Sequence, residues 1–228
     1  MSTLIAIETS TESCSAALLH GGALIERSEL APRRHAELIL PMIESLLDEA
    51  GVSRRQIDAV AVGRGPGAFT GVRLAISVAQ GLALALDIPV VPVSSLAALA
   101  QDAPAHAGET ILAVIDARMG EIYAGCFRRT ASGLEALTEE SVGRAEELVV
   151  PRVDSIVGSG WAVYAEVLAS RLLAAPLFAD GARYPQARAI AQLAAPQFAA
   201  GRSVAPELAL PVYLRDKVAL TLKEQRAR

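Results

Sequence analysis

The sequence predicts an α/β protein with mixed sheets and helices on their faces. Two observations predict this class. Short apolar runs bounded by turn residues alternate with stretches of helical spacing, and three strand-like runs precede the first helix. A hairpin followed by α/β crossovers produces a sheet with both antiparallel and parallel pairs. The 228 residues, 52% hydrophobic and 20% charged, are enough to bury a core and exclude a disordered chain.

The first hundred residues contain the predicted elements in the order β-β-β-α-β-α-β-α. Gly21-Gly22 closes one strand, and Gly51 suits the left-handed residue that follows a helix. We expect strands over 4–8, 15–20 and 23–30, a helix over 33–50, a strand over 58–63, a helix over 70–86, a strand over 88–93 and a helix over 94–101.

A loop with proline and glycine, residues 102–108, is the clearest boundary in the chain. It predicts an N-terminal lobe over 1–102 and a smaller C-terminal lobe over 103–228 that ends in a basic tail. In the second lobe we expect strands over 110–116, 121–129, 133–138 and 155–157, a helical turn over 145–149, and helices over 161–174 and 184–200. A duplicated unit of this plan is the architecture of actin, the sugar kinases and Hsp70, in which a nucleotide lies between two lobes. Here the second lobe is shortened.

The composition argues against several classes of protein. A net charge of −4 and only 4% aromatic residues disfavour a dedicated nucleic-acid binder. Cys14 and Cys126 are too few for a disulfide framework or a thiolate zinc site, and they indicate a reducing compartment. No targeting signal is evident, and the apolar stretch 74–86 is shorter than a membrane span. We therefore expect a cytoplasmic protein that does not contact membranes.

A glycine-rich segment, 63–71, follows a predicted strand and opens a predicted helix. Its helix N-terminus could hold an anion, or its glycines could serve only a tight turn. No Lys-Ser or Lys-Thr pair follows the glycines, so the segment is not a P-loop. No acid ends the next strand, which disfavours a dinucleotide site.

A polar tip, Glu8, Thr9 and Ser10, ends the first strand. Actin-like ATPases use a carboxylate and hydroxyls in such a hairpin around phosphates and Mg²⁺, whereas the plain alternative is a polar turn. The candidate counterpart in the second lobe, 116–118, lacks a glycine-rich turn with hydroxyls. We therefore expect a vestigial phosphate loop and no bound cofactor. The three histidines are dispersed, which predicts no metal site.

Two helices carry more apolar surface than a single core contact requires. The apolar arc of the helix over 33–50 spans about half of its circumference, and small residues recur every fourth position in the helix over 70–86. The pattern fits a subunit interface or a large internal core equally well. On the first interpretation, the chain alone forms a homodimer, and the interface residues are Leu38, Met42, Leu46, Gly71, Ala75, Ala79 and Ala83.

Four motifs together resemble the TsaB (YeaZ) family: Ile7–Ser10, His35–Pro41, Gly65–Arg73 and Ile115–Tyr123. They keep the family's order, and the ending 211–215 also resembles it. The two most specific motifs contribute Gly65, Pro66, Gly67, Phe69, Thr70, Gly71, Arg73, Asp116, Arg118, Glu121 and Tyr123.

The resemblance implies an actin-like (ASKHA) two-lobed fold and a role in making threonylcarbamoyladenosine. That nucleoside lies next to the anticodon of tRNAs that read codons beginning with A. It further implies a non-catalytic subunit that pairs with TsaD, the enzyme that transfers the threonylcarbamoyl group. TsaE would join the larger complex, and tRNA would be reached only through the complex.

The metal site of TsaD has a His-x-x-x-His motif, and the corresponding positions here are Ser95 and Leu99. Leucine cannot bind a metal, so the resemblance does not extend to catalysis. Two other functions stay open: an actin-like small-molecule kinase or ATPase, and a peptidase, which lacks metal ligands here.

Four charged residues of the motifs admit two interpretations. Asp116 and Glu121 are acids, whereas Arg73 and Arg118 are bases. Charge-assisted hydrogen bonds among them would fix the orientation of the lobes. Alternatively, they form a site for a nucleotide or a partner. We favour the structural interpretation, because no pair of metal-bridging carboxylates accompanies them.

Overall fold

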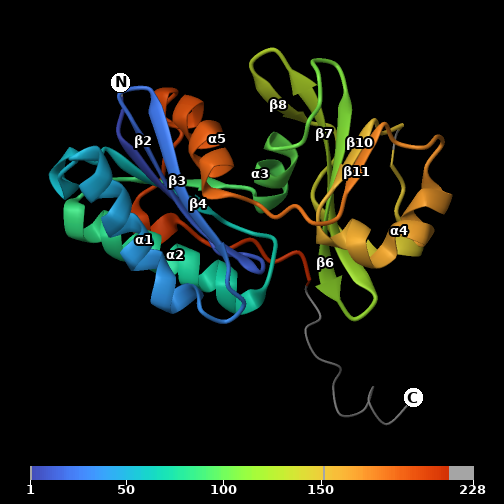
Figure 1. The fold of residues 1–228 in the computed structure, drawn as a ribbon, viewed down its shortest axis with the longest axis horizontal. Helices are drawn as coiled ribbons and strands as arrows, with labels where there is room; N and C mark the ends of the chain where they lie inside the picture. Colours follow the sequence, from blue (N-terminus) through green and yellow to red (C-terminus); the bar gives the residue numbers. More distant parts are fainter. Residues whose placement is uncertain (1, 151, 216–228) are drawn as a thin grey trace, which may run out of the picture.

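The computed structural model describes residues 2–150 and 152–215, and it contains two sheets side by side with helices against their faces (Figure 1). The elements before the crossover are β1 (Leu4–Glu8), β2 (Ser13–His20), β3 (Ala23–Leu30), α1 (His35–Ala50), η1 (Arg54–Gln56), β4 (Ala59–Gly63), α2 (Phe69–Leu86), β5 (Val90–Val93) and α3 (Ser95–Gln101). Those after it are β6 (Thr110–Arg118), β7 (Glu121–Thr130), β8 (Gly133–Ala136), β9 (Ser141–Arg144), η2 (Ala145–Glu147), β10 (Ser155–Val157), α4 (Ser159–Arg171), β11 (Phe178–Asp180), α5 (Ala187–Ala199) and η3 (Pro206–Leu208).

The two sheets repeat one strand plan. The first has the order β3-β2-β1-β4-β5, and the second has the order β8-β7-β6-β10-β11 with β9 added beside β7. In each sheet the first three strands are antiparallel and the last two join in parallel. Both sheets are therefore mixed, which confirms the predicted α/β class. The second lobe is the shorter of the two. Between its third and fourth strands, β8 and β10, it has only β9 and η2, whereas the first lobe has the long helix α1 between β3 and β4.

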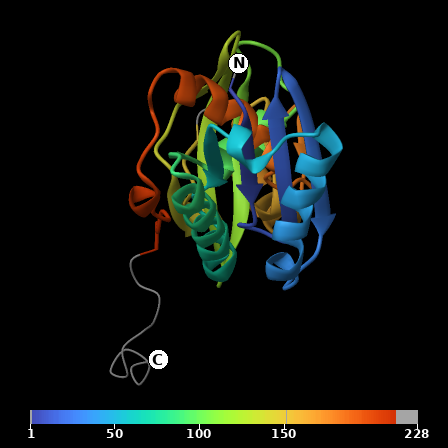
Figure 2. The same ribbon diagram turned by 90° about the vertical axis from the view of Figure 1, so that its left-hand side faces the viewer.

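The first sheet is buried on both faces, which explains why its inner strands are continuously apolar. Ile5 and Ile7 of β1 pack in the core beneath α1 and α2, whereas the alternate residues Leu4 and Ala6 pack beneath α5. Figure 2 shows α1 and α2 together against the first sheet.

The C-terminal segment differs from the expected arrangement. We expected everything after residue 102 to belong to the second lobe, but α5 contacts β1, β2 and β4 of the first sheet. Val204 then pairs with Val90, and the N–H of Val212 donates to the carbonyl of Arg64. The segment returns because the second face of the first sheet is apolar and needs a helix to cover it.

The small residues of α2 face the chain's own sheet. Ala75, Ala79 and Ala83 are fully buried in the first core, together with Leu46 of α1. The prediction that these four side chains form a subunit surface is therefore wrong, because they are already covered within one chain. Their small size instead lets α2 lie close to the strands beneath it.

The other three predicted interface residues also have internal contacts. Leu38 and Met42 are half-buried against the first core. A Cβ on Gly71 would overlap the carbonyl oxygen of Thr9, so this glycine allows α2 to approach the β1–β2 loop.

Most predicted elements are present with shifted ends, and two strands were not predicted. β9 and β11 have four and three residues, too short to carry a periodic signal. α2 has 18 residues, and its length and hydropathy alone would suffice for a membrane span, although a core helix passes the same test. Of the predicted basic tail, residues 216–228 lie outside the described part of the chain.

Candidate functional site between the two lobes

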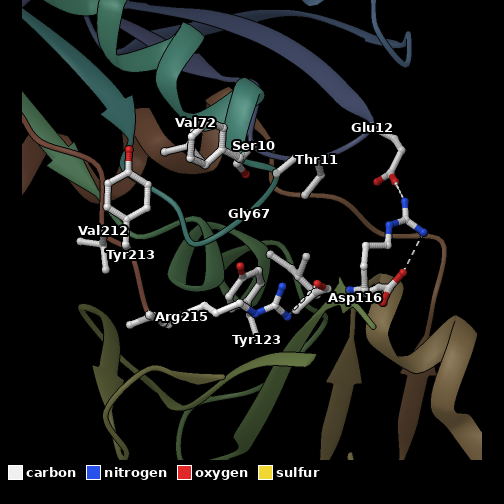
Figure 3. A pocket seen from close by; sticks show the side chains of 16 residues that line it. Ser10, Thr11, Glu12, Gly67, Val72, Asp116, Tyr123, Val212, Tyr213 and Arg215 are labelled. Atoms are coloured by element: carbon white, nitrogen blue, oxygen red, sulfur yellow. Dashed lines mark hydrogen bonds and ion pairs between the residues drawn. The ribbon is translucent and has the colours of Figure 1, made fainter. Parts of the chain in front are cut away.

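A cavity of about 360 Å³ lies where the two lobes meet. The β1–β2 loop and the start of α2 form one wall, the β6–β7 hairpin forms the opposite wall, and residues 212–215 close one side (Figure 3). The predicted polar tip and both specific motifs meet at this cavity.

Glu8 is fully buried beneath the cavity. Its Oε1 accepts a 2.6 Å hydrogen bond from the N–H of Ser10, and its Oε2 accepts a 2.7 Å hydrogen bond from Ser95 Oγ. A Cβ on Gly63 would overlap the carboxylate, so Gly63 provides the room for it. Burial raises the pKa of Glu8 above its ordinary value, and the hydrogen bonds from Ser10 and Ser95 only partly oppose this. This carboxyl group is therefore part of the core, where both of its oxygens accept hydrogen bonds.

Thr9 and Ser10 pack directly against the start of α2. Thr9 Oγ1 donates a 2.7 Å hydrogen bond to the carbonyl of Gly71, and the N–H of Ala68 donates a 2.7 Å hydrogen bond to the carbonyl of Ser10. A Cβ on Gly67 would overlap the carbonyl oxygen of Ser10. The chain's own carbonyl groups thus lie against the N-terminus of α2. The glycines serve close backbone packing, and the vestigial phosphate loop of Glu8, Thr9 and Ser10 stays a prediction.

Ser95 and Leu99 are both fully buried. Leu99 belongs to the core between α3 and the second sheet, and Ser95 is bonded to Glu8. Within residues 2–150 and 152–215, no three or more His, Cys, Asp and Glu side chains gather as a metal site would require.

One predicted cation links the two lobes at the mouth of the cavity. Arg118 Nη2 lies 2.8 Å from Glu12 Oε1 of the β1–β2 loop, and Arg118 Nη1 lies 2.9 Å from Asp116 Oδ2. Asp116 Oδ1 also accepts a 2.9 Å hydrogen bond from the N–H of Arg118, where the backbone is left-handed. Asp116 therefore shapes the hairpin that carries Arg118 to the other lobe.

The other predicted charges have separate partners. Glu121 pairs with Arg215, which also donates a 3.0 Å hydrogen bond to the carbonyl of Ala117. The guanidinium carbon of Arg73 lies 3.1 Å from the centre of the Phe69 ring and 4.9 Å from that of Tyr213. Arg73 is thus held by aromatic rings and does not join the charged set.

Sequence reasoning missed several residues that tie the lobes together. Arg64 and Glu140 form a 3.3 Å ion pair across the junction. The guanidinium of Arg129, on β7 of the second lobe, donates to the carbonyls of Ala100, Gln101 and Ala103 at and just after the end of α3. These pairs are far apart in the sequence, so no local signal marks them.

Comparisons with known proteins decide the family. The family model of TsaD, tRNA N6-adenosine threonylcarbamoyltransferase, matches residues 27–221. The chain is 41% identical to the tRNA threonylcarbamoyladenosine biosynthesis protein TsaB of Escherichia coli K12, over 95% of this chain and 96% of that protein. The chain belongs to the TsaB (YeaZ) family. Identity to the Haemophilus influenzae TsaB protein is 37%, over 95% of this chain and 94% of the relative.

A solved structure of the same family has the same fold. YeaZ from Pseudomonas aeruginosa is 47% identical, with a TM-score of 0.86 over 94% of this chain and all of that one. The resemblance read from the motifs is thereby confirmed, and with it the actin-like fold.

The two most specific motifs of the TsaB resemblance contribute to the cavity. Gly67, Phe69, Asp116, Arg118 and Tyr123 line it. The other residues of these two motifs lie on the segment 65–73 and on the β6–β7 hairpin, whereas the His35–Pro41 motif lies on α1. In this chain Asp116, Arg118 and Glu121 of these motifs form ion pairs at the junction of the lobes, and Arg73 lies against aromatic rings.

Proposed function

We propose that this chain is a non-catalytic subunit of tRNA threonylcarbamoyladenosine biosynthesis that supports a TsaD enzyme by binding to it. The burial of Glu8 and Ser95 in one hydrogen-bonded pair carries the proposal. These are the residues at the positions predicted for phosphate binding and for a metal ligand, and in this chain they are buried and bonded to each other. The names of the TsaB relatives supply the pathway. TsaE would join the complex, tRNA would be bound through it, and the setting would be the cytoplasm.

We place the partner-binding surface on the outward face of α1 and α2. Leu40 and Leu84 are 48% and 63% exposed there, and Gly81 lies exposed on α2. An apolar cavity of about 370 Å³ between the two helices is lined by residues such as Leu47 and Leu82. Exposed large apolar groups beside a cavity are typical of protein-binding surfaces. This surface would serve both pairing with TsaD and self-pairing.

An actin-like kinase or ATPase is the alternative function. It needs a phosphate site between the lobes, and in this chain the carbonyls of Thr9 and Ser10 lie against the N-terminal end of α2, where an anion would compete with them. The geometry therefore supports the subunit role over nucleotide chemistry.

The experiment is a charge substitution on the outward face. Gly81→Arg should preserve the fold, because a Cβ at Gly81 meets nothing within 4 Å. It should weaken co-purification with TsaD at least tenfold, and it should lower the threonylcarbamoyladenosine content of tRNA in cells that depend on this chain. Leu173→Arg, at a position 81% exposed in the second lobe, is the matched control and should change neither. Normal TsaD binding by a folded Gly81→Arg variant would place the interface elsewhere.

A further inference from the structure

The C-terminal segment runs along α2 and forms a surface strip with it (Figure 2). Gln80 Nε2 of α2 donates a 3.1 Å hydrogen bond to the carbonyl of Ala209. The ring centres of Phe69 and Tyr213 lie 6.3 Å apart. The exposed large apolar side chains of this strip are those of Phe69, Leu208, Leu210 and Tyr213. Exposed apolar groups that gather on one surface are typical of a protein-binding site.

One cation, Arg73, lies within the strip. Its guanidinium carbon is 3.1 Å from the centre of the Phe69 ring and 4.9 Å from that of Tyr213. Its Nη1 is buried without a hydrogen-bond partner in the described part of the chain, where Arg73 also takes part in no ion pair. Aromatic faces stabilise a cation only in part, and the strongest partner of a guanidinium is a carboxylate. An acidic group would therefore complete this strip.

An acidic group can reach Arg73 from outside the chain. The Phe69 ring that lies against the guanidinium is 60% exposed. Exposed side chains change rotamer within nanoseconds, so this ring can turn aside without a change in the backbone. The strip is thus accessible to a carboxylate carried by another molecule.

A protein fits this strip better than a nucleic acid does. RNA-binding surfaces gather several free cations, because each phosphate contact needs one. Here Arg64 pairs with Glu140, and Arg215 pairs with Glu121. The two exposed leucines of the strip offer nothing to a phosphate, whereas the apolar side chains of a protein would cover them. A single unpaired guanidinium among apolar groups therefore indicates an acidic side chain of a protein.

The strip continues the outward face of α2. At about 100° per residue, positions 73, 77 and 84 lie within about 80° of Phe69 around the helix axis. Leu84 belongs to the outward face of α1 and α2 on which we place TsaD binding, and it is 63% exposed. A partner on that face would extend over Arg73 toward the C-terminal segment.

We propose that this strip is a second contact region for the TsaD partner and that Arg73 receives an aspartate or glutamate side chain of that partner. The inference rests on the proposed function, which supplies the partner. The carboxylate forms charge-assisted hydrogen bonds with the guanidinium, and the rings of Phe69 and Tyr213 shield these bonds from water. Apolar side chains beside the partner's acid cover Leu208 and Leu210.

Charge substitutions at Arg73 test this, with TsaD affinity measured by titration calorimetry of the full chain. Arg73→Gln should weaken TsaD binding by about fivefold, and Arg73→Glu by about fiftyfold, because the reversed charge repels the partner's acid. Added salt should weaken binding by the unaltered chain more steeply than binding by Arg73→Gln. Leu210→Asp, at an exposed position of the same strip, should weaken binding by about fivefold. Arg171→Glu makes the same charge change at an exposed position of α4, and as the matched control it should bind normally.

A complementary substitution in the partner identifies the acid. When the aspartates and glutamates of TsaD are changed to lysine one at a time, one of these variants should restore binding to Arg73→Glu. A purely structural role of Arg73 would produce no such rescue. Thermal unfolding of each variant verifies that it is folded before its affinity is compared.

Several results would overturn the proposal. One is normal TsaD affinity of a folded Arg73→Glu variant, and another is the absence of any rescue by a lysine variant. Loss of tRNA or inorganic phosphate binding by Arg73→Gln, with TsaD affinity intact, would assign the guanidinium to a phosphate. If Gly81→Arg weakens TsaD binding and Arg73→Glu does not, only the contact at Arg73 is wrong. If neither variant weakens it, the partner surface itself is wrong.

Discussion

Ser95 Oγ lies 2.7 Å from Glu8 Oε2, and both residues are fully buried. The contact joins the end of β1 to the first turn of α3. It unites the carboxylate expected at a phosphate with the residue at the first metal-ligand position of the related enzyme. In this chain the two side chains are hydrogen-bonded to each other inside the core.

Glu8→Gln should raise thermal stability at pH 8 by several °C, since about 1 kcal/mol corresponds to about 2–4 °C for a chain of this size. Burial raises the pKa of Glu8 in the folded chain. The folded state therefore binds the proton more tightly than the unfolded state. The stabilisation from this proton is complete below the unfolded pKa and is lost as pH rises through the folded pKa. A glutamine does not ionise, its Oε1 can still accept from the N–H of Ser10, and its Nε2 can donate to Ser95 Oγ, which reverses the direction of that hydrogen bond.

The measurement is thermal unfolding of both proteins from pH 4 to pH 8. The gain should shrink toward pH 4, where wild-type Glu8 is protonated. A lower melting temperature for Glu8→Gln at pH 8 would mean that the buried group is stabilised as a carboxylate. The tRNA modification supported by the variant should be unchanged.

Gly63→Ala should lower the free energy of unfolding by about 1–3 kcal/mol, the usual cost of overpacking. Its new Cβ would overlap the carboxylate of Glu8, which cannot move without leaving its hydrogen bonds. Gly81→Ala is the matched control, because a Cβ there meets nothing within 4 Å. It should stabilise α2 by about 0.5–1 kcal/mol. Denaturant titration of the two variants decides whether Gly63 is required for space, and equal stability would contradict this role.

Arg129→Ala should destabilise the chain by about 2–4 kcal/mol, because it leaves three part-buried carbonyls at the end of α3 without their charged donor. The adjacent residue provides the control. Arg128 is 47% exposed and pairs with Glu135 at 3.5 Å, so Arg128→Ala should cost less than about 0.5 kcal/mol. Denaturant unfolding curves should separate the two variants clearly. Similar curves would show that Arg129 does not fasten the lobes.

Arg118→Ala should change the free energy of unfolding by less than about 1 kcal/mol. The side chain of Arg118 is 72% exposed, and solvent and salt screen such pairs. The sequence-based interpretation is that Arg118 helps to fix the orientation of the lobes, and the exposure of the side chain makes its effect on stability small. A double-mutant cycle with Glu12→Ala measures the coupling directly. Loss of modification with stability and TsaD binding intact would assign Arg118 to a ligand or partner, and the structural role would then be wrong.

The sequence determined the order of nearly all elements, the mixed α/β class and the family motifs. These features depend on local periodicity, turn residues and short motifs, which neighbouring residues specify by themselves. β11 escaped prediction because its three residues form a strand only through pairing with β10. The return of α5 to the first sheet was equally hidden, since the apolar face that it covers lies far away in the sequence.

The tertiary structure alone decided which apolar and polar groups are free to act. Periodicity showed that Ala75, Ala79 and Ala83 share one face of α2, but a core face and an interface face have the same pattern. Only the position of the sheet assigned them to the core. Likewise, the sequence placed Glu8 at the end of a strand, and the approach of Gly63 and Ser95 from distant segments determined that it is enclosed. Burial depends on contacts between segments that are far apart in the sequence. The motifs could therefore be recognised from the sequence, but which of their side chains are buried could not.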